Sequence, residues 1–365
     1  MNQQLRNMKK YLAIGLLLLL GQVNAAVLLV NNTSNSPGNY SNIDTAIAAA
    51  TIGDTIYISG SPYGYGNFTI SKSVTIISTG ANPQKQLPYT ANVGEIAMAS
   101  NLSNVKVSGL IINGAFAMAP GTNNFDMEYC YFTTKQLQLN SNCNSIKISN
   151  CIFINNYYFG KRNIDGFDIC SGYYTSCTNL LIQNCIFNGA VAGLNIPGTV
   201  IQNNIFIGAD PAFYGVNVYN NGGCYATGYI VNATIQNNIF YRADPLQYTS
   251  GCAFNNNITY NPSGTFTALP GNGNLDNTNP NFVNFPAAGD LFSWAHNYNL
   301  QAASPGNNAG TDGTHIGIYG GTFPVTTSGE TYNMPVIRQM NITNTNVPQN
   351  GNVNVKVRST KSRTN

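Results

Sequence analysis

The sequence has few charged residues, and their scarcity limits what the chain can bind. Lys, Arg, Asp and Glu make up 8% of the 365 residues, with 16 basic and 13 acidic side chains. Three of the basic residues, Arg6, Lys9 and Lys10, precede an apolar stretch near the N-terminus, and four more lie in the last ten positions. The body between them carries more acids than bases, which excludes the basic footprint of a nucleic-acid-binding protein.

Histidine and long apolar runs are also scarce. The chain has 2 His, and its 8 Cys include no Cys-x-x-Cys pair, so we expect no zinc site. The apolar stretch at 11–20 is too short to span a bilayer. Basic residues precede it, and Val23 and Ala25 follow it, so it predicts a signal peptide of residues 1–25, cleaved before Ala26. Export to the periplasm, the cell surface or the medium is expected, with no transmembrane segment in the mature chain; a retained anchor is the alternative.

What the sequence does have is a repeat. Each copy is an alternating apolar run, a residue that tolerates positive φ, and a second short apolar run, which predicts two strands meeting at a corner. The copies are VKVSGLII (105–112), MEYCYF (127–132), IKISNCIF (146–153), LLIQNCIF (180–187), TVIQNNIF (199–206) and ATIQNNIF (233–240). Their corners fall at Gly109, Tyr129, Asn150, Asn184, Asn203 and Asn237, in steps of 20, 21, 34, 19 and 34 residues. Strand repeats of this period predict a parallel β-helix, with loops inserted in the longer steps.

Both ends of this region resemble a known superfamily. An Ala-rich helix expected at about 43–50 leads into three strands ending near 78. This order resembles the N-terminal cap of right-handed parallel β-helix proteins of the pectate-lyase-like superfamily, and YNLQAASPGNNAGTDGTHIGIYGG (298–321) resembles the closing turn of bacterial secreted members. The resemblance implies an all-β, right-handed parallel β-helix over 26–323. Residues 324–365 predict a small β appendage and a basic tail.

The insertion between Asn150 and Asn184 contains a second resemblance. NIDGFDI (163–169) is similar to a strand motif of polygalacturonases, and this implies catalytic roles for Asp165 and Asp168. Such hydrolases need one carboxyl group to protonate the leaving oxygen and another to activate water. The next turn has Val191 and Ala192 where that family has two Asp, and no Gly-His-Gly or Arg-x-Lys follows, so the hydrolase set is incomplete.

A lyase is the other enzyme that this insertion could support. Lys161 and Arg162 would serve as its base and charge neutraliser, although a solvated Lys-Arg pair is the more common arrangement. The calcium-dependent chemistry of pectate lyases requires a cluster of acidic ligands, which the sequence lacks. We therefore predict no cofactor and no metal site, and calcium is not indicated.

Three neighbouring turns also align as GFDI, GLNI and GVNV. The alignment places Asp168, Asn195 and Asn217 in one column, with successive turns about 4.8 Å apart. If this column faces outward, it offers hydrogen bonds to sugar hydroxyls, with Tyr173 and Tyr214 as stacking platforms. If it faces inward, it is a polar ladder that satisfies itself. The sequence leaves both interpretations open.

The cysteines suggest one further column. Cys130, Cys151 and Cys185 each follow a corner residue, so they are expected to stack as free thiols or to pair. Cys170 and Cys177, within one insertion, are the better candidates for a disulfide.

The predicted function is that of a secreted or cell-surface protein that binds a polysaccharide or other glycan along one sheet face. A polysaccharide lyase or glycoside hydrolase with a non-standard site is the first alternative, and a structural or adhesive rod is the second. The oligomeric state is not indicated.

Overall fold

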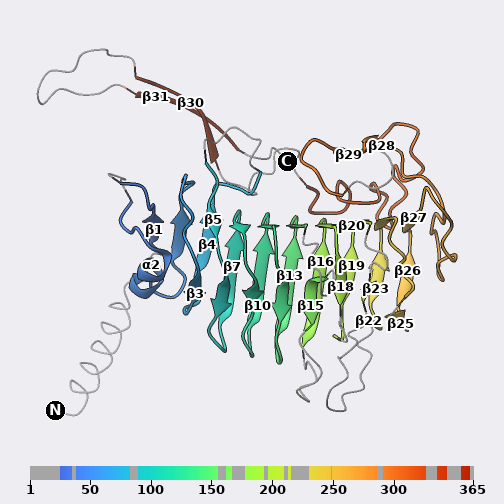
Figure 1. The fold of residues 1–365 in the computed structure, drawn as a ribbon, viewed down its shortest axis with the longest axis horizontal. Coiled ribbons are helices and arrows are strands. Elements are labelled where there is room, and N and C mark those ends of the chain that lie inside the picture. Colours follow the sequence, from blue (N-terminus) through green and yellow to red (C-terminus); the bar gives the residue numbers. More distant parts are fainter. Residues whose placement is uncertain are drawn as a thin grey trace, which may run out of the picture.

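The computed structural model of the chain shows a rod of stacked β-strands, drawn with its long axis horizontal in Figure 1. The structure describes residues 25–34, 38–82, 89–154, 162–166, 177–192, 196–208, 213–214, 230–247, 249–285, 291–325, 335–342 and 355–361. The predicted signal peptide lies almost wholly outside these residues.

Three parallel sheets run along the rod, and the central turns of the chain each add one strand to every sheet. The first sheet has ten strands: β1 (Val27–Val30), β2 (Thr55–Ile58), β4 (Thr75–Ser78), β7 (Ser103–Ser108), β10 (Asn123–Glu128), β13 (Asn144–Ser149), β16 (Thr178–Gln183), β19 (Val200–Gln202), β23 (Thr234–Gln236) and β26 (Ala253–Asn255). The second has eight: β5 (Asn92–Val93), β8 (Ile111–Ile112), β11 (Tyr131–Phe132), β14 (Ile152–Phe153), β17 (Ile186–Phe187), β20 (Ile205–Ile207), β24 (Ile239–Tyr241) and β27 (Ile258–Tyr260). The third has seven: β3 (Phe68–Ile70), β6 (Ile96–Met98), β9 (Phe116–Ala117), β12 (Leu137–Leu139), β15 (Arg162–Gly166), β18 (Ala190–Ala192) and β21 (Phe213–Tyr214). The predicted right-handed parallel β-helix is confirmed.

A short helix and three small sheets complete the described structure. The helix α2 (Ile43–Ala49) covers the N-terminal end of the rod, as predicted, and Asn42 caps it by accepting a hydrogen bond from the amide of Thr45. The small sheets pair β22 (Ile230–Val231) with β25 (Thr249–Ser250), β28 (Phe282–Asn284) with β29 (Asn297–Leu300), and β30 (Pro335–Ile342) with β31 (Val355–Lys361). The last pair is an antiparallel hairpin and forms the predicted C-terminal appendage. No helix among the described residues is long and apolar enough to cross a membrane.

A single residue in the left-handed region forms each corner between the first and second sheets. All six predicted corners have positive φ, namely Gly109 (80°), Tyr129 (54°), Asn150 (54°), Asn184 (53°), Asn203 (55°) and Asn237 (58°). A seventh corner, Asn256 (φ 52°), lies in a copy that the sequence analysis did not include. Gly and Asn adopt this conformation at the lowest cost, which explains why Asn recurs at the bend.

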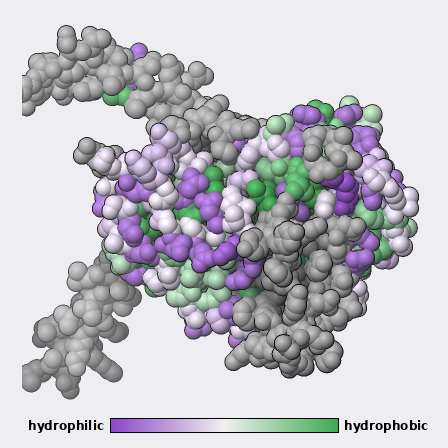
Figure 2. All heavy atoms as spheres, viewed as in Figure 1, coloured by the Kyte–Doolittle hydropathy of each residue, from purple (hydrophilic) through white to green (hydrophobic). Residues whose placement is uncertain are grey.

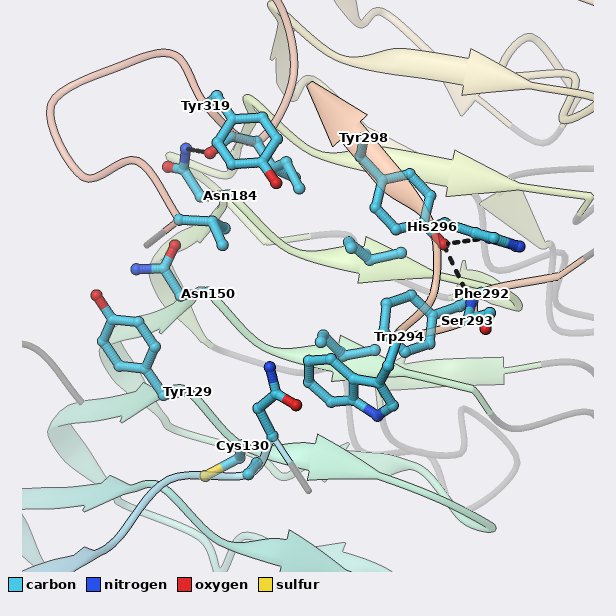
Figure 3. Close-up of a pocket in the computed structure, with 16 residues that line it drawn as sticks. Tyr129, Cys130, Asn150, Asn184, Phe292, Ser293, Trp294, His296, Tyr298 and Tyr319 are labelled. Atoms are coloured by element: carbon cyan, nitrogen blue, oxygen red, sulfur yellow. Dashed lines mark hydrogen bonds between the residues drawn. The ribbon is translucent and has the colours of Figure 1, made fainter. Parts of the chain in front are cut away.

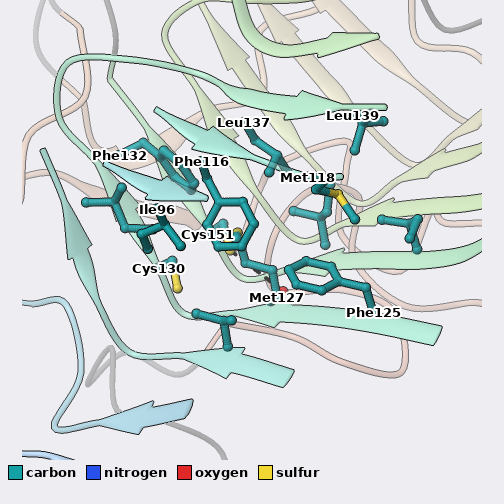
Figure 4. Close-up of a cluster of buried hydrophobic side chains, with 14 of the residues drawn as sticks. Ile96, Phe116, Met118, Phe125, Met127, Cys130, Phe132, Leu137, Leu139 and Cys151 are labelled. Carbon is teal, nitrogen blue, oxygen red and sulfur yellow. Dashed lines mark hydrogen bonds between the residues drawn. The ribbon is translucent and has the colours of Figure 1, made fainter. Parts of the chain in front are cut away.

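Inside the rod, aromatic rings stack from turn to turn. Phe132, Phe153, Phe187, Phe206 and Phe240 are fully buried, and their ring centroids are separated by 4.6, 5.0, 4.9 and 5.0 Å in that order. This separation matches the distance between neighbouring parallel strands, so one ring fits above the next without a gap. Figure 4 shows one end of this core, where rings and aliphatic side chains from all three sheets meet.

A column of thiols lies directly after the corners. Cys130, Cys151 and Cys185 are buried and free, and the amide of Cys151 donates to Sγ of Cys185 at 3.4 Å. Burial raises the pKa of Cys130 and Cys151, so these thiols stay protonated. The predicted column is confirmed, and its members are thiols.

Amides continue the same column toward the C-terminal end. Asn204, Asn238, Asn257 and Asn274 follow, and each Nδ2 donates to Oδ1 of the next residue at 3.0, 3.0 and 3.1 Å. Asn204, Asn238 and Asn257 are fully buried. Each of these amides also donates to a backbone carbonyl of the preceding turn, so the ladder satisfies buried backbone groups as well as itself.

Cys177 lies next to Cys143. The proposed partner Cys170 lies outside the described residues, whereas Cys143 donates its backbone amide to Sγ of Cys177 at 3.3 Å. A hydrogen bond from Cys177 lowers the pKa of Cys143 to about 7. A Cys170–Cys177 disulfide stays a prediction.

The corner geometry predicts the effect of substitution at Asn203. Asn203→Val should lower the free energy of unfolding by about 1 to 3 kcal/mol, because a β-branched residue is strained at positive φ and cannot replace the amide. Asn203→Gly should cost less, because Gly adopts this φ freely. Urea melts of the two variants measure the difference. Equal losses of unfolding free energy in the two variants would mean that the positive φ at this corner does not disfavour a β-branched residue.

Candidate functional site

The corner residues are covered by the C-terminal part of the chain, which runs back along the rod. Nδ2 of Asn256 donates to the carbonyl of Ala309, that of Asn237 to Oγ1 of Thr311, and that of Asn184 to the carbonyls of Ile318 and Gly320. Later residues of this segment bond to corners nearer the N-terminal end of the rod, so the segment runs antiparallel to the direction in which the turns stack. We call residues 309–320 the clip. The sequence predicted a closing turn here, whereas the structure lays these residues across existing turns.

Two glycines of the clip have different reasons to be glycine. A Cβ added at Gly320 would overlap the backbone carbonyl oxygen of His315, within the clip itself. Gly317 has a φ of 91°, and a Cβ there would lie 2.8 Å from Cδ1 of Ile239. The tight turn at Gly320 and the left-handed backbone at Gly317 therefore favour glycine at both positions.

A cavity lies beside the clip, next to the corner at Asn184. The cavity has a volume of about 130 Å³. Its walls come from the corners and the second sheet on one side and from the loops around β29 and after the clip on the other (Figure 3). The lining residues are Ala81, Asn82, Tyr129, Cys130, Asn150, Ile152, Asn184, Ile186, Phe292, Ser293, Trp294, His296, Tyr298, Ile318, Tyr319 and Val325.

Aromatic rings form the wall contributed by residues 292–298. Phe292 and Tyr298 lie nearly parallel, with an interplanar angle of 9° and centroids 5.8 Å apart. Trp294 meets Phe292 edge-on at 5.0 Å and Tyr131 of β11 edge-on at 5.5 Å. Figure 2 shows hydrophobic side chains gathered on this face of the rod, next to the loops of β28 and β29. The wall is a rigid apolar surface of several rings.

Hydrogen bonds from the same loop fix the position of Tyr298. Its hydroxyl oxygen accepts a hydrogen bond from the amide of Ser293 at 3.2 Å and lies 3.0 Å from Nδ1 of His296 (Figure 3). Tyr298 is buried, and this burial raises the pKa of its hydroxyl above the usual range. The hydroxyl therefore stays protonated and holds the ring against Phe292.

Asn150 is one of the buried polar side chains for which the described residues offer no hydrogen-bond partner. Its side chain is only 6% exposed, yet neither Nδ2 nor Oδ1 has a hydrogen-bond partner among the described residues. Figure 3 shows it between Asn184 and Tyr129, on the opposite side of the cavity from Trp294. The clip forms hydrogen bonds with Asn184, whereas no described residue forms one with the side chain of Asn150. A buried amide without partners costs about 1 to 3 kcal/mol, which marks this position for a bound group.

The lining of the cavity carries no carboxylate, ammonium or guanidinium group. Among its lining residues, all of which the structure describes, none is Asp, Glu, Lys or Arg. Burial raises the pKa of the Cys130 thiol, which removes its nucleophilic form at neutral pH. Among the described residues, no group of three or more His, Cys, Asp and Glu could hold a metal ion. The cavity offers aromatic rings, amides and the imidazole of His296.

Comparisons with known proteins give remote structural similarity only. No protein-family model and no curated protein sequence matches the chain. Alginate lyase from Paenibacillus sp. str. FPU-7 is 17% identical with a TM-score of 0.43, covering 64% of this chain and 92% of that one. Pectin methylesterase from Aspergillus niger is 14% identical with a TM-score of 0.31, covering 70% and 86%. ORF18 of Geobacillus virus E2 is 14% identical with a TM-score of 0.33, covering 72% and 61%. These values assign no activity to the chain.

The strand order and the corners define the architecture by themselves. The fold is a parallel β-helix of three sheets. Three parallel sheets, a one-residue corner between two of them and an N-terminal capping helix are all present in the described residues.

The structure describes only part of the site predicted from sequence. Lys161, Asp168, Tyr173, Asn195 and Asn217 lie outside the described residues, and their predicted roles are untested. The backbones of Arg162, Asp165 and Tyr214 are described, in strands β15 and β21 of the third sheet. The predicted site therefore belongs to the third sheet, whereas the cavity lies beside the corner of the other two.

The strand register tests the alignment on which the predicted column depends. Asp165 is the register partner of Ala192, which in turn pairs with Tyr214. Asp168, Asn195 and Asn217 lie outside the described residues, so their alignment in one column stays a prediction. On its other side Asp165 pairs with Gln138. Neither register partner of Asp165 is acidic.

The cavity residues were not found from sequence. Trp294 and Tyr298 lie outside any repeat, more than 100 positions from the corners that they face. The one available signal was the aromatic-rich stretch from Phe282 to Tyr298, which the sequence analysis did not single out.

Proposed function

We propose that the protein binds carbohydrate and that one sugar unit occupies the cavity beside Asn150. The observation that carries this proposal is the buried, unpartnered amide of Asn150 among aromatic rings. A sugar presents apolar C–H faces that pack on rings and hydroxyl groups that both donate and accept hydrogen bonds. The amide of Asn150 needs one acceptor and one donor, and a single hydroxyl or a neighbouring pair supplies both.

The dimensions of the cavity suit a single ring. The cavity volume of about 130 Å³ is the space that the centres of water molecules can reach, and it corresponds to roughly ten waters. We propose that one sugar ring with its hydroxyls takes the place of these waters. Trp294 and Phe292 form a stacking wall, and Asn150 lies across from them. A longer glycan would continue outward from this unit along the surface.

The lining also favours a neutral sugar over an acidic one. A uronate in the cavity would bury its carboxylate with no Lys or Arg among the lining residues. Burial of an unpaired charge is strongly unfavourable. We therefore propose neutral hexoses or pentoses as the ligand class, with export to the cell surface or medium as the setting.

The third-sheet column remains a second binding element in this proposal. Asp168, Asn195 and Asn217, with Tyr173 and Tyr214, would contact a glycan along that face if they point outward. Hydrolysis there is less well supported, because Asp165 has Gln138 and Ala192 as register partners and so lacks a neighbouring acid. Polygalacturonan is expected to release no reducing ends. Release that Asp165→Ala abolishes would instead restore the hydrolase.

Fluorescence provides a direct test, because Trp294 is the only tryptophan of the chain. Neutral oligosaccharides chosen from a glycan array should shift its emission on titration, whereas oligogalacturonates should not. Asn150→Gly removes the amide while keeping a residue that adopts positive φ, and it should weaken binding at least about tenfold through the loss of two hydrogen bonds.

Two further variants make this test specific. Asn123→Ala, at an exposed position of β10, is the matched control and should bind normally. Asp168→Ala, followed by calorimetry, tests the third-sheet column separately. A glycan whose binding depends on Asp168 but not on Asn150 would move the site away from the cavity. Absence of any fluorescence response to neutral glycans would overturn the proposal.

A further inference from the structure

The first strand of the rod is tied to a buried carboxylate by its leading residue. The backbone nitrogen of Ala26 donates to Oδ1 of Asp54 at 2.7 Å, and the carbonyl of Ala26 accepts from the amide of Thr55 at 2.8 Å. Asp54 is 4% exposed and lies just before β2. Ala26 therefore has a fixed position at the point where β1 begins.

The two oxygens of Asp54 have different surroundings. Oδ2 accepts two hydrogen bonds from Thr51, from the amide at 2.7 Å and from Oγ1 at 2.8 Å. Oδ1 has the Ala26 nitrogen as its partner. The Thr51 amide, and then the Ala26 amide, lower the pKa of this carboxyl group, so it is ionised at neutral pH.

Asp54 also lacks a direct cationic partner. The nearest cation, Lys72, lowers the pKa of Asp54 through space, but its Nζ donates to the carbonyls of Ala48 and Ala50, at 2.6 Å each. No Lys or Arg of the described chain forms an ion pair with Asp54. The carboxylate of Asp54 is therefore held by backbone amides and a hydroxyl, and its charge is left without a cation in contact. An ammonium group in place of the Ala26 amide would supply that cation.

The sequence supplies such a group at this position. The basic residues, the short apolar stretch and the small residues Val23 and Ala25 predict cleavage between Ala25 and Ala26. Both Ala25 and Ala26 are exposed in the structure, so a peptidase could reach the bond.

We propose that cleavage of the Ala25–Ala26 bond places the new α-ammonium group of Ala26 on the carboxylate of Asp54. An endopeptidase adds water across the amide; the new carboxylate stays with Ala25, and the amine of Ala26 takes up a proton. A single N–H donor becomes a charged group with three donors, and a hydrogen bond becomes an ion pair. Maturation thereby fixes the first strand on the rod.

The position of the cleavage is specific. Successive N–H groups along a strand point to opposite sides, so a chain beginning at Val27 would direct its amine away from Asp54. A chain that begins one residue earlier would leave only the neutral amide of Ala26 at the carboxylate. The pairing therefore identifies Ala26 independently of the signal-peptide pattern.

The reactivity of the N-terminal amine in the exported protein tests this proposal. The full-length sequence is expressed, the exported product is purified, and intact-mass analysis is expected to show Ala26 as its first residue. The amine is then labelled near neutral pH with a reagent that reacts with the deprotonated α-amine. The ion pair should slow labelling at least about tenfold relative to Asp54→Asn, which corresponds to a rise of about one unit in the pKa of the amine.

Two comparisons keep the result interpretable. If Asp54→Asn does not fold, the wild type unfolded in urea provides the unpaired amine, and it should label at least about tenfold faster than the folded protein at matched pH. Gln202→Ala, on the outer surface far from α2, is the matched control and should label like the wild type. A different N-terminal residue, or equal labelling rates for the folded and unfolded wild type, would overturn the proposal.

Discussion

Asn238→Ala is expected to lower the free energy of unfolding by about 3 to 5 kcal/mol, one of the two largest losses that we predict. Asn238 is fully buried, and its Oδ1 accepts hydrogen bonds from both the backbone amide and Nδ2 of Asn204, at 2.9 and 3.0 Å. Its Nδ2 donates to the carbonyl of Ile201 and to Oδ1 of Asn257. Truncation leaves several buried groups without partners, and each costs about 1 to 3 kcal/mol. Urea unfolding followed by circular dichroism measures the loss.

A second, partly exposed amide ladder provides the control. Nε2 of Gln202 donates to Oε1 of Gln183 at 3.1 Å, and Nε2 of Gln236 donates to Oε1 of Gln202 at 3.0 Å. Gln183 is buried, whereas Gln202 and Gln236 are partly exposed. Gln202 is partly exposed, so water can replace the lost bonds after Gln202→Ala, and we expect a loss below about 1 kcal/mol. Similar losses in the two variants would show that burial does not set the strength of these ladders.

Phe187→Ala is expected to cost about 3 to 5 kcal/mol, for a different physical reason. Phe187 is fully buried between Phe153 and Phe206, with ring centroids 5.0 and 4.9 Å away and interplanar angles of 8° and 17°. Hydrogen bonds of the second sheet fix the strands on either side, so the walls of the new cavity cannot collapse. The loss combines the transfer free energy of the ring with the unfilled volume.

Two variants show whether this cost comes from the stack itself. Phe187→Leu keeps most of the volume and should cost less than half as much as Phe187→Ala. Tyr63→Ala removes a ring that is 63% exposed, and it should stay within about 0.5 kcal/mol of wild type. A loss below about 1 kcal/mol for Phe187→Ala would mean that the core relaxes around the gap.

The fold could be predicted from sequence because its decisive feature is local. A corner needs one residue with positive φ between two short apolar runs, and the sequence shows that pattern within eight residues. All six predicted corners were confirmed, including Tyr129, which is neither Gly nor Asn. The corner at Asn256 was missed although its step of 19 residues from Asn237 repeats an earlier one. That copy contains three successive Asn residues, 255–257, and the sequence does not show which of them has the positive φ of the corner.

The cavity could not be predicted in the same way, because it depends on contacts between distant residues. Its wall at residues 292–298 faces corners that precede it by more than 100 residues, and the clip sets its position by binding the corner amides. The motifs at 298–321 resemble those of a closing turn, and a closing turn is what they predict. Nothing in those motifs indicates that the segment turns back and lies across the rod.

The third-sheet site is an intermediate case. The alignment of GFDI, GLNI and GVNV predicted a register, and the described pairs Asp165 with Ala192 and Ala192 with Tyr214 have that register. The direction in which Asp168 points is a separate question, because it depends on how each insertion leaves the sheet. The spacing of the repeats predicts which residues align from turn to turn, but it does not predict whether the side chain of Asp168 points outward or inward.

The clip has a mechanical consequence. Its hydrogen bonds join Asn256, Asn237, Asn203 and Asn184 one after another, in the order opposite to the direction in which the rod is built. Tension applied through the C-terminal hairpin would load the packing of Phe323 on Tyr129 and Lys147, then the contact at Asn184, and the remaining corners only after these break. The segment would therefore peel from the rod one bond at a time, at low force. Ile318 and Tyr319 would leave the cavity when the contact at Asn184 breaks, so pulling on the tail would open the site before any turn of the rod unravels.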